Sequence, residues 1–89
     1  MMYPFLTLED DTEIVHSEVL PNETVRVYIE KPTENGFKSA YCVLPDYTWS
    51  EIRKYSDDEI QEHQKILESL SHLIIEFARE GGFNRASGL

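Results

Sequence analysis

Alternating hydrophobic and polar positions predict extended structure in the first half of the chain. Segment Thr24–Glu30 carries Val or Ile at every second position, a period of two that is typical of a strand with one buried face. Segments Thr12–Leu20 and Phe37–Leu44 have a similar length, and residues 21–23 and 31–36, which contain Pro, Asn and Gly, favour turns between them. The pattern therefore predicts a three-stranded antiparallel meander.

The second half has the period of one long amphipathic helix with both ends marked. Ser56 followed by Glu59 forms a capping box, in which each side chain accepts a hydrogen bond from the other residue's backbone N–H. Gly81-Gly82 favours a left-handed stop, so the helix is predicted from about Asp57 to Glu80. Its apolar stripe, wide enough to cover the sheet, consists of Ile60, Leu67, Leu70, Ile74 and Phe77.

The predicted helix is longer than the predicted sheet. About 24 helical residues span roughly 36 Å, whereas strands of about eight residues span roughly 26 Å. One end of the helix is therefore expected to need another cover, and Ile75, which lies off the stripe, is either a stray surface residue or part of that second contact. Residues 46–52 are predicted to form a connecting turn of helix, with Trp49 and Ile52 closing one end of the core.

Length and composition limit the fold to one small domain. A chain of 89 residues can build a single core, and 40% hydrophobic residues with four Gly and four Pro exclude a low-complexity or wholly disordered chain. The fold class is therefore predicted as α+β, a β-β-β meander followed by a C-terminal helix packed on the sheet. The domain spans residues 1–89, and residues 84–89 are expected to be a frayed tail.

Charge narrows the possible partners. Asp and Glu number 17 against 8 Lys and Arg, which gives a net charge of -9. Nucleic acids and anionic membranes attract proteins through Lys and Arg, so neither is expected as a direct ligand. A protein partner is expected to be basic or neutral, or to be a second copy in a homodimer; the alternative is that the acidic surface serves only solubility.

Cysteine use and the N-terminal segment favour the cytoplasm. The single Cys42 cannot form an intramolecular disulfide, and small secreted domains usually need several. The first eight residues lack a basic region, and their apolar run ends at Glu9, before a signal-peptide core could form.

Candidate chemistry is sparse. Glu59 with His63, and His72 with Glu68 and Glu76, stand four residues apart on the helix, but a pair is not a metal site, so no metal or other cofactor is expected. Cys42 shares its strand face with apolar residues and is expected to be a buried, inert thiol. His16 could act as a general base, yet the sequence offers it no nucleophile in a recognisable triad or elbow context.

Two resemblances carry limited functional information. Three segments resemble those of an uncharacterised family of short acidic bacterial proteins: the opening Met-Met-Tyr-Pro-Phe-Leu-Thr-Leu, the stretch Glu13–Ser17 and the C-terminal stretch His72–Phe83. That family has no assigned activity, so the resemblance does not indicate one for this chain. The run Tyr28–Phe37, a strand ending Leu44-Pro45 and a Ser-led helix are similar in order to the HicB-type antitoxin core, over about half the chain and without the Gly that usually follows that Pro. This second resemblance implies a small protein that binds another protein.

Two functional hypotheses follow. The first is a non-enzymatic protein–protein interaction module, such as an inhibitor, an antitoxin-like protein or an adaptor. The second is a minimal enzyme whose site forms at a homodimer interface around His16 or His72. For the first hypothesis, the apolar C-terminal end of the helix and nearby aromatic residues are the expected partner-binding set: Tyr47, Trp49, Ile74, Ile75, Phe77 and Phe83.

Overall fold

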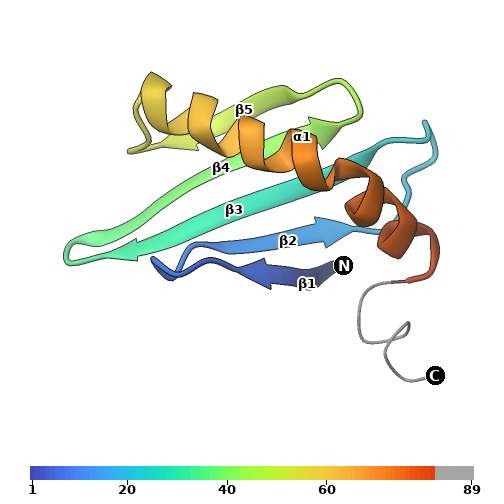
Figure 1. The fold of residues 1–89 in the computed structure, drawn as a ribbon, viewed down its shortest axis with the longest axis horizontal. Helices are drawn as coiled ribbons and strands as arrows, with labels where there is room; N and C mark the ends of the chain where they lie inside the picture. The colour runs from blue at the N-terminus through green and yellow to red at the C-terminus, as the bar shows by residue number, and fades with distance from the viewer. Residues whose placement is uncertain (82–89) are drawn as a thin grey trace.

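A single antiparallel sheet and one helix make up the described fold. The computed structural model describes residues 1–81 of the chain. Within these residues the elements are β1 (Met2–Thr7), β2 (Glu13–Ser17), β3 (Val25–Thr33), β4 (Gly36–Leu44), β5 (Thr48–Arg53) and α1 (Asp57–Arg79). The strands lie in the order β1-β2-β3-β4-β5, and α1 crosses one face of the sheet diagonally (Figure 1). The α+β class, the central meander and the C-terminal helix are confirmed, but the predicted number of strands is wrong.

Two edge strands were missed. β1 pairs with β2 although it contains Pro4, and its register with β2 shifts between Pro4 and Leu6. β5, which pairs with β4, occupies the segment for which a turn of helix was predicted. Its register also shifts, and Glu51 within it has a φ of 49°, so the alternation of inward and outward side chains is interrupted. Bulges removed the period of two on which the strand prediction depends.

The core lies between α1 and the face of the sheet that it covers. β3 contributes Val25, Val27 and Ile29, and β4 contributes Ala40, Cys42 and Leu44, all at most 2% exposed. These residues alternate with outward-facing ones, as the sequence pattern predicted for the central strands. Two fully buried helical residues, Leu67 and Ile74, pack against them.

The ends of α1 follow the sequence signals. The Ser56 hydroxyl accepts the Glu59 backbone N–H at 3.2 Å, and the Glu59 carboxylate accepts the Ser56 backbone N–H at 2.9 Å, so the capping box is confirmed. At the other end, Gly81 has a φ of 84°, the left-handed conformation that favours glycine after a helix. Gly82 and the predicted tail at 84–89 lie outside the described residues.

The expected excess of helix over sheet is not found at the described end of α1. Phe77 packs against Phe5 of β1, with ring centroids 5.8 Å apart, and Ala78 is only 3% exposed. The prediction that the helix would extend past the sheet is wrong because the sheet is wider than three strands and because α1 runs across it at an angle (Figure 1). The added strand β1 covers the last turns of the helix.

Candidate interaction surface

The sheet has one covered face and one open face. Every described strand belongs to this sheet, and no described helix packs on the side opposite α1. The strand register places a set of outward residues on that side, which we call the open face. It comprises Pro4, Thr7, Glu13, Val15, Arg26, Tyr28, Glu30, Pro32, Phe37, Ser39, Tyr41, Val43, Thr48, Ser50 and Arg53, of which Ser39 is buried between its neighbours.

Two tyrosines occupy the centre of the open face. Tyr28 and Tyr41 are direct cross-strand partners, and their ring centroids lie 4.7 Å apart. The Arg26 guanidinium lies 4.0 Å above the Tyr41 ring and forms a 2.8 Å ion pair with Glu51 of β5. The ring contact, the cation–π contact and the ion pair restrain these side chains, so their orientations are set before any partner arrives.

The polar end of Tyr28 is hydrogen-bonded and neutral. The Tyr28 hydroxyl donates to the Glu30 carboxylate at 2.8 Å. Partial burial, followed by this hydrogen bond to Glu30, raises the pKa of Tyr28. The ring therefore presents an uncharged, half-buried surface at neutral pH, flanked by the half-buried Val15 and Val43.

The partner-binding set expected from the sequence is not brought together. Trp49 donates its indole N–H to Gln64 at 3.0 Å, on the β5 side of α1. Phe77 lies 13 residues after Gln64 on the same helix, which corresponds to about 20 Å. It contacts β1 at the opposite edge of the sheet. The aromatic residues at the two edges therefore cannot complete one patch.

The other members of that set are partly or wholly withdrawn from the surface. Ile74 has no exposed surface, so it is not available to a partner. Ile75 and Tyr47 are partly buried and pack against the core, which means that Ile75 is not a stray surface residue. Phe83 lies outside the described residues.

The two histidines of the enzyme hypothesis lie on different sides of the helix layer. His16 is fully buried against Tyr3 and Phe5, and its Nδ1 donates to the Ser17 carbonyl at 2.8 Å. His72 is exposed, and as it stands two positions from the buried Ile74 it points about 200° around the helix from the core. The structure does not bring these imidazoles together.

Sequence reasoning missed a buried polar cluster beneath the start of α1. Thr12, Tyr55 and His63 are each at most 9% exposed, and the Tyr55 and His63 rings meet edge to face at 4.9 Å. Among the described residues, Thr12 Oγ1, Tyr55 OH and His63 Nδ1 have no hydrogen-bond partner of good geometry, although Thr12 lies close enough to favour the ionised form of Tyr55. The signal available was the spacing of His63 and Leu67, four apart on one helix face.

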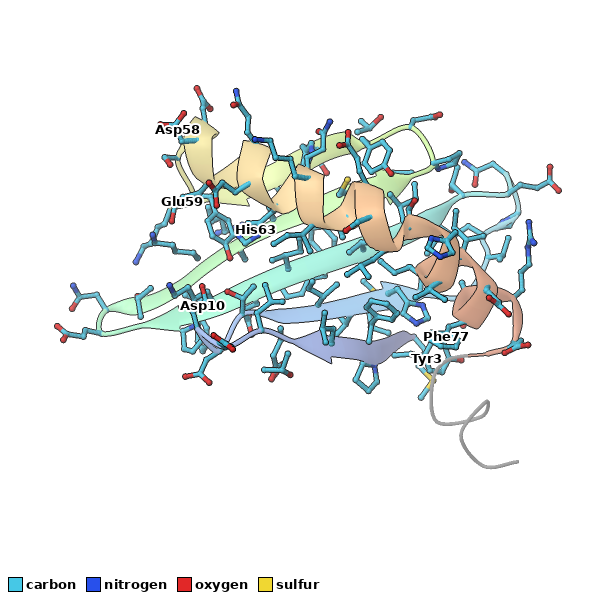
Figure 2. All side chains as sticks on the ribbon, in the orientation of Figure 1. Tyr3, Asp10, Asp58, Glu59, His63 and Phe77 are labelled. Carbon is cyan, nitrogen blue, oxygen red and sulfur yellow. The ribbon has the colours of Figure 1, made fainter. Side chains whose placement is uncertain are left out.

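Charged groups surround this cluster without entering it. Asp10 pairs with Lys31 at 3.3 Å and Glu59 pairs with Lys38 at 2.7 Å, and Figure 2 shows Asp10, Glu59 and His63 at one end of the molecule, away from Tyr3 and Phe77. Burial lowers the pKa of His63 and raises that of Tyr55 to about 12. Both side chains are therefore neutral at pH 7, and the cluster lacks a charged acid or base of its own.

The outward surface of α1 is more acidic than the open face. The outward surface of α1 exposes two basic residues, Lys65 and Arg79, against five acidic ones: Asp57, Asp58, Glu62, Glu68 and Glu76. The open face, together with Glu51, carries two Arg and three Glu. The open face is therefore close to neutral in a strongly acidic protein.

The described residues show neither a metal site nor a membrane-spanning helix, and the chain has no match among known proteins. Within residues 1–81, no three His, Cys, Asp or Glu side chains converge as a metal would require. No helix in the described part of the chain has the length and apolar character needed to cross a membrane. Comparison with protein-family models, with curated proteins and with solved structures finds no match.

Proposed function

We propose that this protein is a non-enzymatic protein–protein interaction module, in the broad class of inhibitors, antitoxin-like proteins and adaptors, and that the open face is its contact surface. The observation that carries the proposal is the pre-oriented group of Tyr28, Tyr41 and Arg26 at the centre of an uncovered sheet. Tyrosine and arginine supply much of the binding energy of protein interfaces when they are central and become desolvated. The alternative, a minimal enzyme with a site at a homodimer interface around His16 or His72, has less support, because His16 is sealed in the core.

The chemistry of the open face limits the partner. Half-buried aromatic and aliphatic side chains line its middle, with charged groups toward the ends of the strands, which is the arrangement of an apolar centre and a polar rim. A partner is expected to present a flat apolar surface of similar size. The exposed acidic surface of α1 remains free in such a complex.

Site-specific photo-crosslinking in the source cell tests this proposal. A photoreactive phenylalanine analogue replaces Tyr41 on the open face, and the matched control carries it at Ser69, an exposed position on the outward surface of α1. We expect a discrete protein adduct from position 41 and none of comparable yield from position 69. Absence of any protein adduct from position 41, in a variant that retains the helical circular dichroism of the wild type, would remove the open face as a contact surface.

A further inference from the structure

The edges of the sheet are poorly suited to association. β1 carries Pro4, which has no backbone N–H to offer, and a register shift beside it. On the other edge, Glu51 within β5 has a positive φ of 49°, and Lys54, the first residue after β5, has a positive φ of 66°. Such irregularities at both edges prevent a second chain from continuing the hydrogen-bonded ladder. Association through the sheet is therefore directed to its open face.

Charged residues on the open face lie on two sides of the tyrosine row. The row through Val15, Tyr28 and Tyr41 crosses the middle of the sheet. Arg26 lies in the neighbouring row toward one end of the strands. Glu13 and Glu30, which are direct cross-strand partners, lie toward the other end, in a row that ends at Arg53 of β5. Neither carboxylate forms an ion pair with a described basic residue, and two like charges placed opposite each other repel.

We propose that the partner at the open face is a second copy of this chain, packed sheet to sheet around a two-fold axis that runs between the sheets along the tyrosine row. This inference rests on the proposed function and names the partner. The rotation reverses the strand direction, so Tyr28 meets its counterpart and Arg26 approaches Glu30 of the other copy. An arginine has five N–H donors, so Arg26 can keep its ion pair with Glu51 and donate to a second carboxylate.

The distribution of charge favours packing through the open faces over packing through the helices. Packing the open faces together leaves both acidic helix surfaces outward, on opposite sides of the dimer, where their repulsion is weakest. Packing the helices together would instead bring the five acidic residues of one α1 against those of the other. Self-association of a chain with a net charge of -9 is thus possible through its near-neutral face.

The available area is sufficient for a specific dimer of moderate affinity. The five described strands have five to nine residues each, and at about 3.3 Å per residue and about 4.8 Å between strands they present roughly 550 Å² of sheet surface in each copy. Two copies would bury about 1,100 Å², which exceeds the roughly 1,000 Å² that a specific interface requires. Dissociation in the micromolar range is the expected consequence.

Sedimentation equilibrium of the whole chain, combined with a charge exchange, tests the dimer and its orientation. We expect the wild type to approach twice its 10.4 kDa mass at high micromolar concentration. Arg26→Glu should weaken the dimer at least about tenfold, because the new carboxylate meets Glu30 of the other copy. Lys65→Glu, an identical change of charge on the outward surface of α1, is the matched control and should leave the dissociation constant nearly unchanged.

The double variant Arg26→Glu/Glu30→Arg gives the decisive result. Positions 26 and 30 lie about 13 Å apart along β3, too far for a direct ion pair within one chain. Recovery of dimerisation in the double variant therefore requires contact between two copies in the proposed orientation. If Arg26→Glu and the double variant dimerise equally poorly, the proposed two-fold arrangement is wrong.

A distance measurement tests the orientation without changing the charges of the open face. A nitroxide attached at Ser50→Cys, in the tyrosine row, should give a distance distribution near 10–20 Å between copies, because facing sheets pack about 10 Å apart. The same label at Ser69→Cys should give a clearly longer distance, and the buried Cys42 should not take up the label. A dimer with the shorter distance at Ser69 would place the interface on α1 and contradict the inference.

The outcomes separate this inference from the proposed function. A wild type that is monomeric at high micromolar concentration overturns the homodimer. If position 41 is then crosslinked to a different protein, the interaction module stands with another partner. If position 41 gives no adduct, both proposals fail.

Discussion

Cys42 illustrates how burial decides the chemistry of one side chain. Its thiol is completely buried in the core face of β4, and desolvation raises its pKa to about 12. The thiolate, which is the reactive form, is therefore almost absent at neutral pH. We expect the native protein to resist a thiol reagent over the time in which the protein unfolded in denaturant reacts completely. Rapid native labelling would mean that the strand opens locally.

His63 should make stability sensitive to mild acid. Burial lowers its pKa, and the carboxylates of Asp10, Glu59 and Glu62 oppose that shift only in part. The folded state thus favours neutral imidazole, so its stabilising contribution is complete above about pH 6.5 and declines as the pH falls below that value. Denaturant titrations between about pH 7 and pH 5 should show this decline.

The matched variants for this prediction are His63→Gln and His72→Gln. The first removes the titrating group from the cluster, and the second removes an exposed histidine of the same helix. We expect a flatter dependence of the unfolding free energy on pH in His63→Gln and no such change in His72→Gln. Equal slopes in the wild type and His63→Gln would assign the acid sensitivity elsewhere.

Glu59 should contribute in a separate, more acidic range. Its hydrogen bond to Lys38, followed by that from the Ser56 backbone, lowers its pKa to about 2 from the usual 4.5. A lowered carboxyl pKa stabilises the fold above pH 4.5, and this contribution is lost as the pH falls toward 2. Glu59→Gln keeps the capping acceptor but removes the charge, and should lower stability by about 0.5 kcal/mol at pH 7, since the pair is partly exposed. The unfolding free energies of the wild type and Glu59→Gln should converge as the pH approaches 2.

At the scale of elements, α1 depends on its first turn. Ser56→Ala removes the side-chain acceptor of the Glu59 backbone N–H, and we expect a loss of about 1 kcal/mol in the free energy of unfolding. Ser56→Asp retains an acceptor at the same place and should recover most of that loss. An unchanged denaturation midpoint in Ser56→Ala would show that the cap does not limit stability.

Elements with regular patterns were predictable, and irregular edge strands were not. The central strands and α1 followed periods of two and 3.6 over most of their length, and Ser56, Glu59 and Gly81 marked the helix ends. β1 and β5 contain bulges, so their side chains do not alternate over enough residues to be recognised. Missing them led directly to the incorrect inference that part of the helix lacked a cover.

The candidate surface was hidden from sequence reasoning for a related reason. Tyr28, Tyr41 and Arg26 each occupy a predicted outward position of a strand, which is an unremarkable place for a polar or aromatic residue. Only the strand register brings Tyr28 opposite Tyr41 and places Arg26 above the Tyr41 ring. Pairing between strands, rather than composition, defines the open face.

At the scale of the whole molecule, the two sides of the sheet have separate tasks. The covered side holds the core and the buried polar cluster, and its ion pairs to Lys31 and Lys38 fasten the start of α1 and the segment around Asp10. The open side contributes little to that packing. A substitution such as Arg26→Glu can therefore alter association while the helix and core stay in place.

The hydrogen bond between Trp49 and Gln64 gives the protein a built-in optical probe. Trp49 is the single tryptophan of the chain, and its indole joins β5 to α1. Its fluorescence should respond when the helix leaves this edge of the sheet, whereas far-ultraviolet circular dichroism reports the helix itself. We expect the two signals to change at the same denaturant concentration, as a cooperative small domain requires. An earlier fluorescence transition would reveal an intermediate in which an intact α1 has swung away from β5.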